Sequence, residues 1–519
     1  MLKGLFGFCL LLTQQVSAQD IDVLHYQYSL LLTDKNDVVE GSASIHLVRQ
    51  SKEPLVHLDL AGPSKGKGMV VSSVMENGTT EIKFIQKDDQ LIITLPPGKT
   101  GDTINLTIRY KGVPADGLII SKNKHGDRTF FSDNWPTRAR QWIPCNDRPD
   151  DKASFEFFVS APQHYSVISN GVRISEKVLP NGMKQTHWRE TVPQPTKVMV
   201  IGVARFAVKE FEASKTGIPV SAWVYPQDSS KGFHDYAIVP SMLEFFSDYI
   251  GPYAYRKLAN VQSTTIFGGM ENASAIFYAE SSVTGDRKFE DVMAHEVAHQ
   301  WFGNMASEKS FRHLWLSEGF ATYLTNIYWE QKYGVEKMRE RLEKDRKEII
   351  EFARQHPHGV VDSSCSNMQL LNTNSYQKGG WVLHMLRREV GDQHFQNILQ
   401  AYYRQYMGGN ADTRDFEAVA EKISGRELTW FFDQWLYRAG IPQLEMETSV
   451  GNGEFKFYIK QKGPVYRFNL EVHIVMEDGE LRKEVFEVRE ALSEFKIPIK
   501  GTSVQYTIDP EVNLLFELK

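Results

Sequence analysis

The sequence has little cysteine, no excess of positive charge and no long apolar run beyond its first residues. Only three cysteines occur in 519 residues, which excludes a fold built on a disulfide framework. Cys145 and Cys365 lie far apart along the chain; they could pair, but two separate buried thiols are the simpler interpretation. A net charge of −6 offers no basic surface for nucleic acid. No later stretch approaches the roughly 20 apolar residues of a membrane span.

The N-terminus combines three features of a secretory signal. Lys3 precedes an apolar run at residues 5–12, and Val16-Ser17-Ala18 has the small residues of a cleavage site. The run is too short to cross a bilayer, so an uncleaved anchor is the weaker alternative. Residues 1–18 are therefore predicted to be a signal peptide. We expect the mature protein to be exported, to a periplasm or out of the cell, and to have no membrane span after cleavage.

The pattern of apolar residues divides the rest of the chain into three parts. Short segments rich in β-branched residues fill residues 19–204, which predicts an N-terminal all-β domain. Helical spacing dominates residues 205–440, and a strand-rich patch near its start predicts a mixed α/β domain. Alternating segments return in residues 441–519, which suit a small C-terminal β-sandwich. The predicted fold class is multidomain α+β.

Individual elements are also expected from the spacing. The clearest strands are 26–32, 42–48, 91–95, 104–110, 455–460, 468–475 and 504–508. The expected helices are 241–249, 289–304, 319–333, 335–356, 379–390 and 395–406. Segment 335–353 is heavily charged and is interpreted as a solvated helix face.

Two histidines stand four residues apart in a strongly helical segment, His295-Glu296-Val297-Ala298-His299. Residues four apart on a helix are about 40° apart around its axis, so both imidazoles point at one ion. Glu296 projects about 100° from His295, close enough to act on a water at the metal without taking a ligand position. This pattern is a zincin signature. The alternative is an incidental charged face of a helix.

Glu318 is the expected third ligand. It stands nineteen residues after His299, where the next apolar-periodic segment begins. A neighbouring helix could bring this carboxylate to the ion, which gives two histidines, one glutamate and an open fourth position. Such a zinc site activates water and polarises a carbonyl. Glu296 would then serve as general base, and as acid toward the leaving amine. Taken alone, Glu318 could equally be a solvent-facing carboxylate.

The longer motifs around these residues resemble the aminopeptidase N family of gluzincin peptidases, which includes leukotriene hydrolase. The resemblance rests on HEVAHQWFGN at 295–304 and LWLSEGFA at 314–321. It extends to WIPCNDRP at 142–149 and GIP at 440–442, and so covers most of the mature chain. The resemblance implies one zinc ion per chain and a thermolysin-like catalytic domain within residues 205–440.

The family's Gly-x-Met-Glu-Asn exopeptidase motif is matched by Gly268-Gly269-Met270-Glu271-Asn272. Two glycines in a strand allow another backbone to approach, and an extended peptide could pair with this strand. The resemblance implies that Glu271 meets the α-amine of the substrate and fixes where the peptide must end. A glycine-rich bulge with a surface glutamate is the alternative.

Ser375-Tyr376-Gln377-Lys378-Gly379 resembles the family segment whose tyrosine stabilises the oxyanion. The resemblance thus implies that Tyr376 is a catalytic residue beside Glu296, with a phenol hydroxyl as the donor. Without the resemblance, a tyrosine just before a helix would be interpreted as a packing residue.

The sequence departs from the family at two points. Trp135 occupies the position at which some relatives place a Gln or Glu beside the substrate amine, so it either lines the first substrate pocket or belongs to the core. Amine recognition then depends more heavily on Glu271. Many relatives also have a large C-terminal helical domain. The β-rich residues 441–519 cannot supply one, so we expect a short form with a more open cleft.

These features predict a zinc-dependent aminopeptidase that acts on peptides with a free N-terminus. An endopeptidase is the main enzymatic alternative, and Glu271 argues against it. A binding protein built on an inactive protease would lack a ligand or the base, yet His295, Glu296, His299 and Glu318 are all present. One relative also hydrolyses a lipid epoxide, but no feature of this sequence indicates a lipid tunnel. The sequence carries no signal for an oligomeric state.

Overall fold

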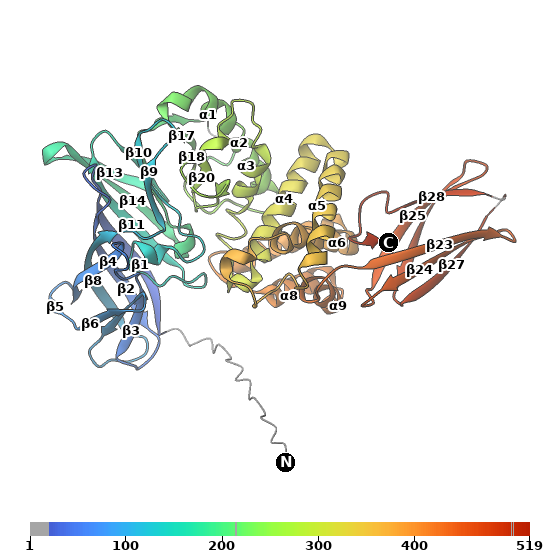
Figure 1. Cartoon of the computed structure of the whole chain (residues 1–519), viewed down its shortest axis with the longest axis horizontal. Helices are drawn as coiled ribbons and strands as arrows, with labels where there is room; N and C mark the ends of the chain where they lie inside the picture. Colours follow the sequence, from blue (N-terminus) through green and yellow to red (C-terminus); the bar gives the residue numbers. More distant parts are fainter. Residues whose placement is uncertain (1–19, 213–214, 500, 502) are drawn as a thin grey trace, which may run out of the picture.

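The computed structural model describes residues 20–212, 215–499, 501 and 503–519. The predicted signal peptide lies outside the described residues, and export therefore stays a prediction. A β-rich part, a mostly helical part and a second β-rich part follow one another along the long axis of the molecule (Figure 1). This order confirms the predicted fold class.

The N-terminal part consists of strands, and residues 20–212 contain no α-helix. Its strands are β1 (Ile21–Leu31), β2 (Val39–Arg49), β3 (Leu55–Asp59), β4 (Gly68–Glu76), β5 (Thr80–Glu81), β6 (Phe84–Lys87), β7 (Gln90–Thr94), β8 (Thr103–Val113), β9 (Leu118–Lys122), β10 (Arg128–Ser132), β11 (Ala153–Pro162), β12 (Ser166–Ser169), β13 (Val172–Leu179), β14 (Met183–Gln194) and β15 (Ile201–Ala204). An eight-stranded sheet has the order β13-β14-β11-β1-β2-β8-β4-β5; smaller sheets are β3-β7-β6 and β12-β15-β10-β9. Buried residues recur at every second position of β2 and β8, as expected for strands with one face on a core.

A five-stranded sheet opens the middle part. It contains β16 (Ala207–Glu210), β17 (Val220–Val224), β18 (Leu258–Ser263), β19 (Gly269–Met270) and β20 (Ala275–Ala279). In the order β16-β17-β18-β20-β19, the three central strands run parallel, and β19 pairs antiparallel with β20 at the edge. Because β19 is an edge strand, its outer backbone groups have no strand partner in the sheet.

Two helices connect strands of this sheet, and the other helices follow it in the sequence (Figure 1). The helices are α1 (Ser229–Tyr236), α2 (Val239–Tyr249), α3 (Glu290–Ala298), α4 (Trp315–Tyr333), α5 (Val335–Gln355), α6 (Gly379–Val390), α7 (Asp392–Tyr406), α8 (Thr413–Ser424) and α9 (Thr429–Phe432). Two short strands, β21 (Ser307–Glu308) and β22 (Asn410–Ala411), pair between them. Helices α3 and α5 both lie against α4, and α6 packs closely on α4 as well.

Two predicted helix boundaries are wrong. The helix expected at 289–304 ends at Ala298, and the chain then turns through Gly303, whose φ of 107° is not helical. His299 keeps a helical conformation as the capping residue, with its amide bonded to the carbonyl of His295. The next helix begins at Trp315, so Glu318 lies within its first turn.

Three helices were not predicted, and the shortest of them, α9, has only four residues. Helix α1 contains few apolar residues, which leaves no clear periodic pattern. Helix α8 begins with a capping box in which Asp412 and Asp415 bond each other's backbone amides. Such a pair three residues apart before an apolar-periodic run is a sequence signal for a helix start.

The C-terminal part is a small sandwich of two sheets, as predicted. Its strands are β23 (Gln443–Gly451), β24 (Glu454–Lys462), β25 (Phe468–Met476), β26 (Leu481–Val488), β27 (Leu492–Pro498), β28 (Val504–Ile508) and β29 (Glu517–Leu518). The sheets have the orders β27-β24-β23-β29 and β26-β25-β28. Phe486 of one sheet stacks on Phe457 and Phe495 of the other, which closes the core between them.

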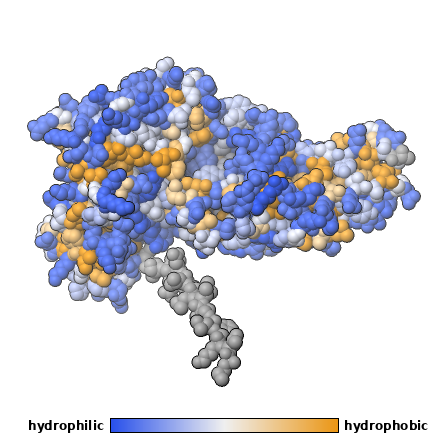
Figure 2. Space-filling model, viewed as in Figure 1, coloured by the Kyte–Doolittle hydropathy of each residue, from blue (hydrophilic) through white to orange (hydrophobic). Residues whose placement is uncertain are grey.

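Two buried apolar clusters support the molecule. One fills the N-terminal sheets and reaches Met270 and Phe311 of the middle part; the other runs through the helices into the C-terminal sandwich. The face in Figure 2 is largely hydrophilic over the helices and has hydrophobic patches over the β-rich parts at both ends.

None of the helices in the described residues is long and apolar enough to span a membrane. Cys145 and Cys365 are unpaired, but only Cys145 is buried, so the prediction of two buried thiols holds for one of them.

Candidate active site

Three side chains from α3 and α4 converge on one point. The Nε2 atoms of His295 and His299 lie 3.0 Å apart, and they lie 3.3 and 3.2 Å from Oε2 of Glu318. Among the described residues, this is the one group of three or more His, Cys, Asp or Glu side chains whose ligand atoms cluster closely enough for a metal ion. The three predicted ligands therefore come together in space.

The spacing of these atoms fits a zinc ion. Zinc binds histidine nitrogen at about 2.0–2.1 Å in a tetrahedral arrangement, which places neighbouring ligand atoms about 3.3 Å apart. The outer nitrogen of His299, Nδ1, lies 3.1 Å from the carbonyl oxygen of Phe302 and 3.2 Å from the Ser317 hydroxyl. A proton held on Nδ1 by the carbonyl leaves Nε2 free to coordinate. Site geometry and donor types thus both match a zinc site.

The charges around this point also favour a cation. Burial lowers the pKa of His299, but the carboxylates of Glu318, Glu271 and Glu296 raise it more strongly, to about 10. Burial raises the pKa of Glu318, yet the two imidazoles hold it well below its usual range. Three buried carboxylates surround one small volume, and a divalent cation is the charge that would balance them.

Glycines bring the supporting segments into direct contact. A Cβ on Gly319 would lie 2.8 Å from the backbone carbon of Gly379, so α4 and the start of α6 touch through their backbones. The π-helical turn Asn374–Lys378 leads directly into α6. This close approach places the Tyr376 ring 5.9 Å from the His295 ring, in nearly parallel planes.

Glu296 faces the cavity next to β19. The side chain is 5% exposed, and burial raises its pKa well above the usual range. A Cβ on Gly269 would lie 2.3 Å from Oε1 of Glu296, so no side chain larger than hydrogen fits there while the carboxylate keeps its place. The lack of a side chain at Gly269 therefore leaves room for the Glu296 carboxylate beside β19, the edge strand with which a peptide could pair.

Glu271 is buried, and one of its oxygens has no partner. The side chain is 5% exposed, and Oε1 forms no hydrogen bond. The side-chain amides of Gln300 and Asn304 donate to the Glu271 carbonyl at 2.9 and 2.7 Å, which ties this residue to the turn after α3. An unpaired buried carboxylate is unfavourable, and a positively charged ligand group would compensate it.

Tyr376 lines the cavity on the α6 side. Burial and the nearby carboxylates raise the pKa of its phenol well above the usual value, so the hydroxyl keeps its proton at neutral pH. A protonated phenol is a hydrogen-bond donor. The position and the protonation state both suit donation to an oxygen that gains negative charge.

Trp135 is both buried and in contact with the cavity, so its place in the core does not exclude contact with a substrate. Its ring packs edge-on against Phe267 and Phe311, at centroid distances of 6.2 and 5.7 Å. The indole is 2% exposed. These aromatic rings form an apolar wall near Glu271.

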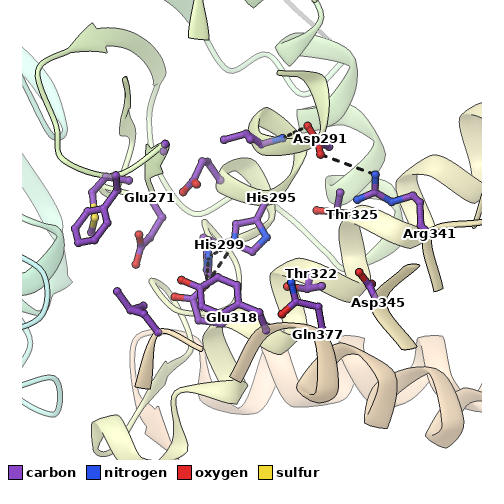
Figure 3. A pocket seen from close by; sticks show the side chains of 18 of the residues that line it. Glu271, Asp291, His295, His299, Glu318, Thr322, Thr325, Arg341, Asp345 and Gln377 are labelled. Atoms are coloured by element: carbon purple, nitrogen blue, oxygen red, sulfur yellow. Dashed lines mark hydrogen bonds and ion pairs between the residues drawn. The ribbon is translucent and has the colours of Figure 1, made fainter. Parts of the chain in front are cut away.

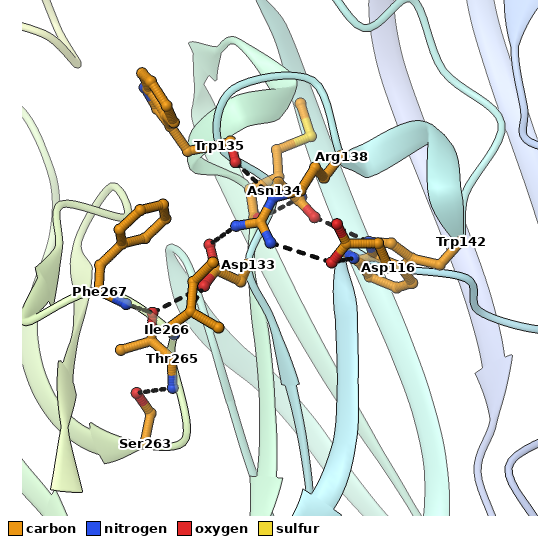
Figure 4. A network of polar contacts seen from close by, with 12 residues as sticks. Asp116, Asp133, Asn134, Trp135, Arg138, Trp142, Ser263, Thr265, Ile266 and Phe267 are labelled. Carbon is orange, nitrogen blue, oxygen red and sulfur yellow. Dashed lines mark hydrogen bonds and ion pairs between the residues drawn. The ribbon is translucent and has the colours of Figure 1, made fainter. Parts of the chain in front are cut away.

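A buried polar network holds this wall in place (Figure 4). Asp133 accepts hydrogen bonds from the Arg138 guanidinium, from the Thr265 hydroxyl at 2.9 Å and from the Ile266 amide at 3.3 Å. Arg138 also donates to the Trp135 carbonyl at 2.7 Å. The network therefore joins the N-terminal part to the loop that leads into the glycine-rich strand. Sequence analysis did not identify it.

The cavity that contains these residues has a volume of about 400 Å³. Its wall includes every predicted site residue except Asn272. After Glu271 the chain turns inward, and the Asn272 side chain is 1% exposed and lies outside the cavity. The position of the Asn272 side chain therefore does not support its predicted role in binding substrate.

Sequence analysis also missed one side of the cavity. Arg341, Lys344, Asp345 and Glu348 of α5 line it, although this segment was interpreted as a solvated helix face. The charged pattern of α5 is typical of a surface helix, and contact with a cavity depends on how the helix packs on α4. The face that meets the cavity could not be identified from local sequence.

Two family profiles match this chain. Residues 235–435 match the peptidase family M1 domain, and residues 23–198 match the peptidase M1 N-terminal domain. The chain belongs to the peptidase M1 family. Membership confirms the resemblance predicted from the motifs, and the second match covers most of the N-terminal strands.

Individual relatives agree with this assignment. Glutamyl aminopeptidase of Rattus norvegicus is 25% identical over 482 residues, which cover 85% of this chain and 50% of that protein. Probable aminopeptidase 1 of Saccharolobus solfataricus is 26% identical over 535 residues, 95% of this chain and 64% of that protein. The chain spans about half the length of the glutamyl aminopeptidases that it matches.

A solved structure shares the fold. The Legionella pneumophila aminopeptidase A, in complex with aspartic acid, superposes with a TM-score of 0.83 at 19% identity. The match covers 97% of this chain and 60% of that chain. The arrangement of all three parts thus recurs in a known structure.

Proposed function

We propose that this protein is a zinc-dependent aminopeptidase that removes single residues from the free N-termini of peptides. One observation carries the proposal. A buried carboxylate with an unpaired oxygen, Glu271, lies in the same cavity as the converging ligands and Glu296. Membership of the peptidase M1 family and the names of the aminopeptidase relatives support it.

His295, His299 and Glu318 would hold the metal. When bound, zinc supplies a Lewis acid that polarises the scissile carbonyl and makes water more acidic. The protein's own task is to keep two imidazoles and one carboxylate in fixed positions, and His299 would lose its extra proton when the metal binds. The hydrogen bonds at Nδ1 of His299 serve that purpose.

Glu296 moves the proton. Its carboxylate accepts a proton from the water that attacks the scissile carbonyl carbon, and then donates that proton to the nitrogen of the leaving peptide. Burial and the neighbouring carboxylates raise the pKa of Glu296, which makes it a stronger base than a solvated glutamate. A raised pKa favours the step in which the carboxylate accepts the proton from water.

Tyr376 stabilises the oxygen of the carbonyl as negative charge develops on it. The phenol hydroxyl remains protonated and can donate a hydrogen bond to that oxygen. Glu271 binds the α-ammonium group at the end of the substrate, with its unpaired Oε1 as acceptor. The peptide would lie along the free edge of β19, and Trp135 would cover its first side chain.

The export predicted from the N-terminal sequence is part of the proposal. The protein would then act on peptides in a periplasm or outside the cell. A secretory segment of this type is recognised by its charge, its apolar run and its cleavage site.

The test uses purified protein and a panel of aminoacyl-aminocoumarins, each with a free and an N-acetylated amine. Activity is measured before chelation, after chelation and after added zinc. We expect zinc-restored hydrolysis of the free-amine substrates only. Cleavage of acetylated substrates would favour an endopeptidase. Zinc-loaded protein that cleaves none of them would contradict the proposal.

A further inference from the structure

The cavity continues past the metal ligands to helix α5. Figure 3 shows Glu271 on one side of His295, and Asp291, Arg341 and Asp345 on the other. All of these residues line the same cavity. The far side of the cavity is a charged wall whose residues take no part in the proposed reaction. It consists of Asp291 of α3 and of Arg341, Lys344, Asp345 and Glu348 of α5.

The direction of the substrate follows from the proposed function, on which this inference rests. Glu271 holds the α-ammonium group, and the bond to be cut lies at the metal ligands. In an extended chain successive residues advance by about 3.3 Å. The residue after the cut bond therefore lies on the side of the cavity opposite Glu271, next to the charged wall.

The positive charges of this wall already have partners. Nε of Arg341 donates to the Asn326 side chain at 2.7 Å, its guanidinium stacks on the Trp329 ring at 5.0 Å, and Asp291 lies 3.9 Å from Nη1. Lys344 lies 3.8 Å from Glu348, its neighbour one turn along the same helix. Arg341 is thus engaged within the protein, whereas Lys344 has only a long, exposed contact, which contributes little.

Asp345 is different. Its carboxylate has a hydrogen-bond contact with the Asn326 side chain but no ion-pair partner within 4.0 Å among the described residues, and Figure 3 shows it on the same side of His295 as Arg341. Burial raises the pKa of Asp345 to about 6, although the charge of Arg341 opposes the shift. With Asp291 and Glu348, the wall has three acidic and two basic side chains.

We propose that this wall selects peptides with lysine or arginine directly after the cleaved bond, with Asp345 as the principal partner. A basic side chain would reach Asp345 from the metal side and give its carboxylate the ion-pair partner that the protein itself does not supply. An acidic side chain at the same position would meet three carboxylates, and of the two cations Arg341 is already engaged within the protein.

The test compares peptides that differ only in their second residue. Zinc-loaded protein is given Ala-X-Ala-amide, with X as arginine, lysine, leucine or glutamate, and kcat/KM is measured for each. We expect arginine and lysine to exceed leucine about ten-fold, with glutamate lowest, as one charge-assisted contact at a partly exposed site allows. Equal values for arginine and leucine would overturn the proposal.

Variants of α5 assign the effect to one residue. Asp345→Asn should reduce the arginine-to-leucine ratio of kcat/KM to about one, and Asp345→Lys should favour glutamate over arginine. Glu343→Gln removes a charge from the exposed side of the same helix, outside the cavity, and should keep the wild-type ratio. A ratio unchanged in Asp345→Asn would contradict the assignment.

The failure of this inference differs from a failure of the proposed function. Wild-type protein that cleaves alanyl-aminocoumarin and every peptide, without a preference at the second residue, contradicts only the role of the charged wall. Wild-type protein that cleaves neither alanyl-aminocoumarin nor any peptide contradicts the aminopeptidase proposal, and the inference with it.

Discussion

Gly269 and Glu296 are packed so closely that a methyl group on the glycine would lie 2.3 Å from the carboxylate. The edge strand β19 and the helix α3 therefore meet at the point where the proposed base stands. A peptide paired with β19 would present its backbone beside Glu296. One glycine thus links the substrate strand to the proton-transfer group.

Replacing Gly269 by alanine tests this contact. The new methyl group would push the Glu296 carboxylate aside, while the metal ligands stay in place. We expect kcat to fall at least ten-fold, with wild-type zinc content and a melting temperature within a few degrees. Gly268→Ala is the matched control, because a Cβ there meets nothing within 4 Å. Equal losses in both variants would show that the contact with Glu296 is not the cause.

Tyr376→Phe removes one hydroxyl and keeps the ring that stacks near His295. Loss of a single oxyanion donor typically lowers kcat about 100- to 1,000-fold, so a fall in that range is expected with little change in KM. Steady-state kinetics on alanyl-aminocoumarin measure both constants. A variant with near wild-type kcat would remove Tyr376 from the mechanism.

Asp133→Asn tests the network behind the aromatic wall. The substitution leaves the Arg138 guanidinium without its buried anionic partner, so we expect the free energy of unfolding to fall by about 1–3 kcal/mol. The loop at Thr265 and Phe267 should also loosen, which raises KM more than it lowers kcat. Urea unfolding measures the fall in the free energy of unfolding, and steady-state kinetics measure the rise in KM.

Asp116→Asn is the control for that network. Asp116 also pairs with Arg138, at 3.1 Å, but its side chain is half exposed. Exposed pairs contribute little, so both stability and KM should stay close to wild type. A larger effect from Asp116 than from Asp133 would contradict the importance that we assign to the buried partner.

His384 should make the protein sensitive to acid. Burial and nearby arginines lower the pKa of this histidine to about 3, and its ring contacts the Tyr323 hydroxyl and the Val512 carbonyl, both at 3.0 Å. The unfolded chain binds this proton near pH 6.5, so stability is fully present above that pH and is lost as the pH falls toward 3.

The measurement is urea unfolding between pH 7 and pH 4, for wild type and His384→Gln. Glutamine keeps a donor and an acceptor without a titrating group. We expect the variant to lose less stability than wild type as the pH falls over this range. Identical slopes of the free energy of unfolding against pH would exclude His384 as the source.

Much of the site follows from local sequence, because its ligands come from short motifs. His295 and His299 are four residues apart in a helical segment, and the position of Glu318 near the start of the next helix is visible from the apolar pattern. The roles of Glu271 and Tyr376 came from the family resemblance, since neither residue is distinctive by itself. The strands and their alternation predicted the two β-rich parts.

Other features depend on packing between distant segments. The role of α5 as a cavity wall requires its contact with α4, and the Asp133 network joins residues more than 130 positions apart. The early end of α3 was missed because Trp301 and Phe302, in the turn that contains Gly303, continue the apolar spacing after the helix has stopped. Spacing alone cannot separate a buried turn from a further helical turn.

The most direct test of the central claim measures zinc content and turnover together, in wild type and in Glu296→Gln. The account predicts one zinc ion per chain in both proteins, and release of aminocoumarin from alanyl-aminocoumarin by wild type only. The glutamine has nearly the same shape but cannot accept the proton. Absence of zinc from the wild type, or near-normal turnover by the zinc-loaded variant, would contradict the account.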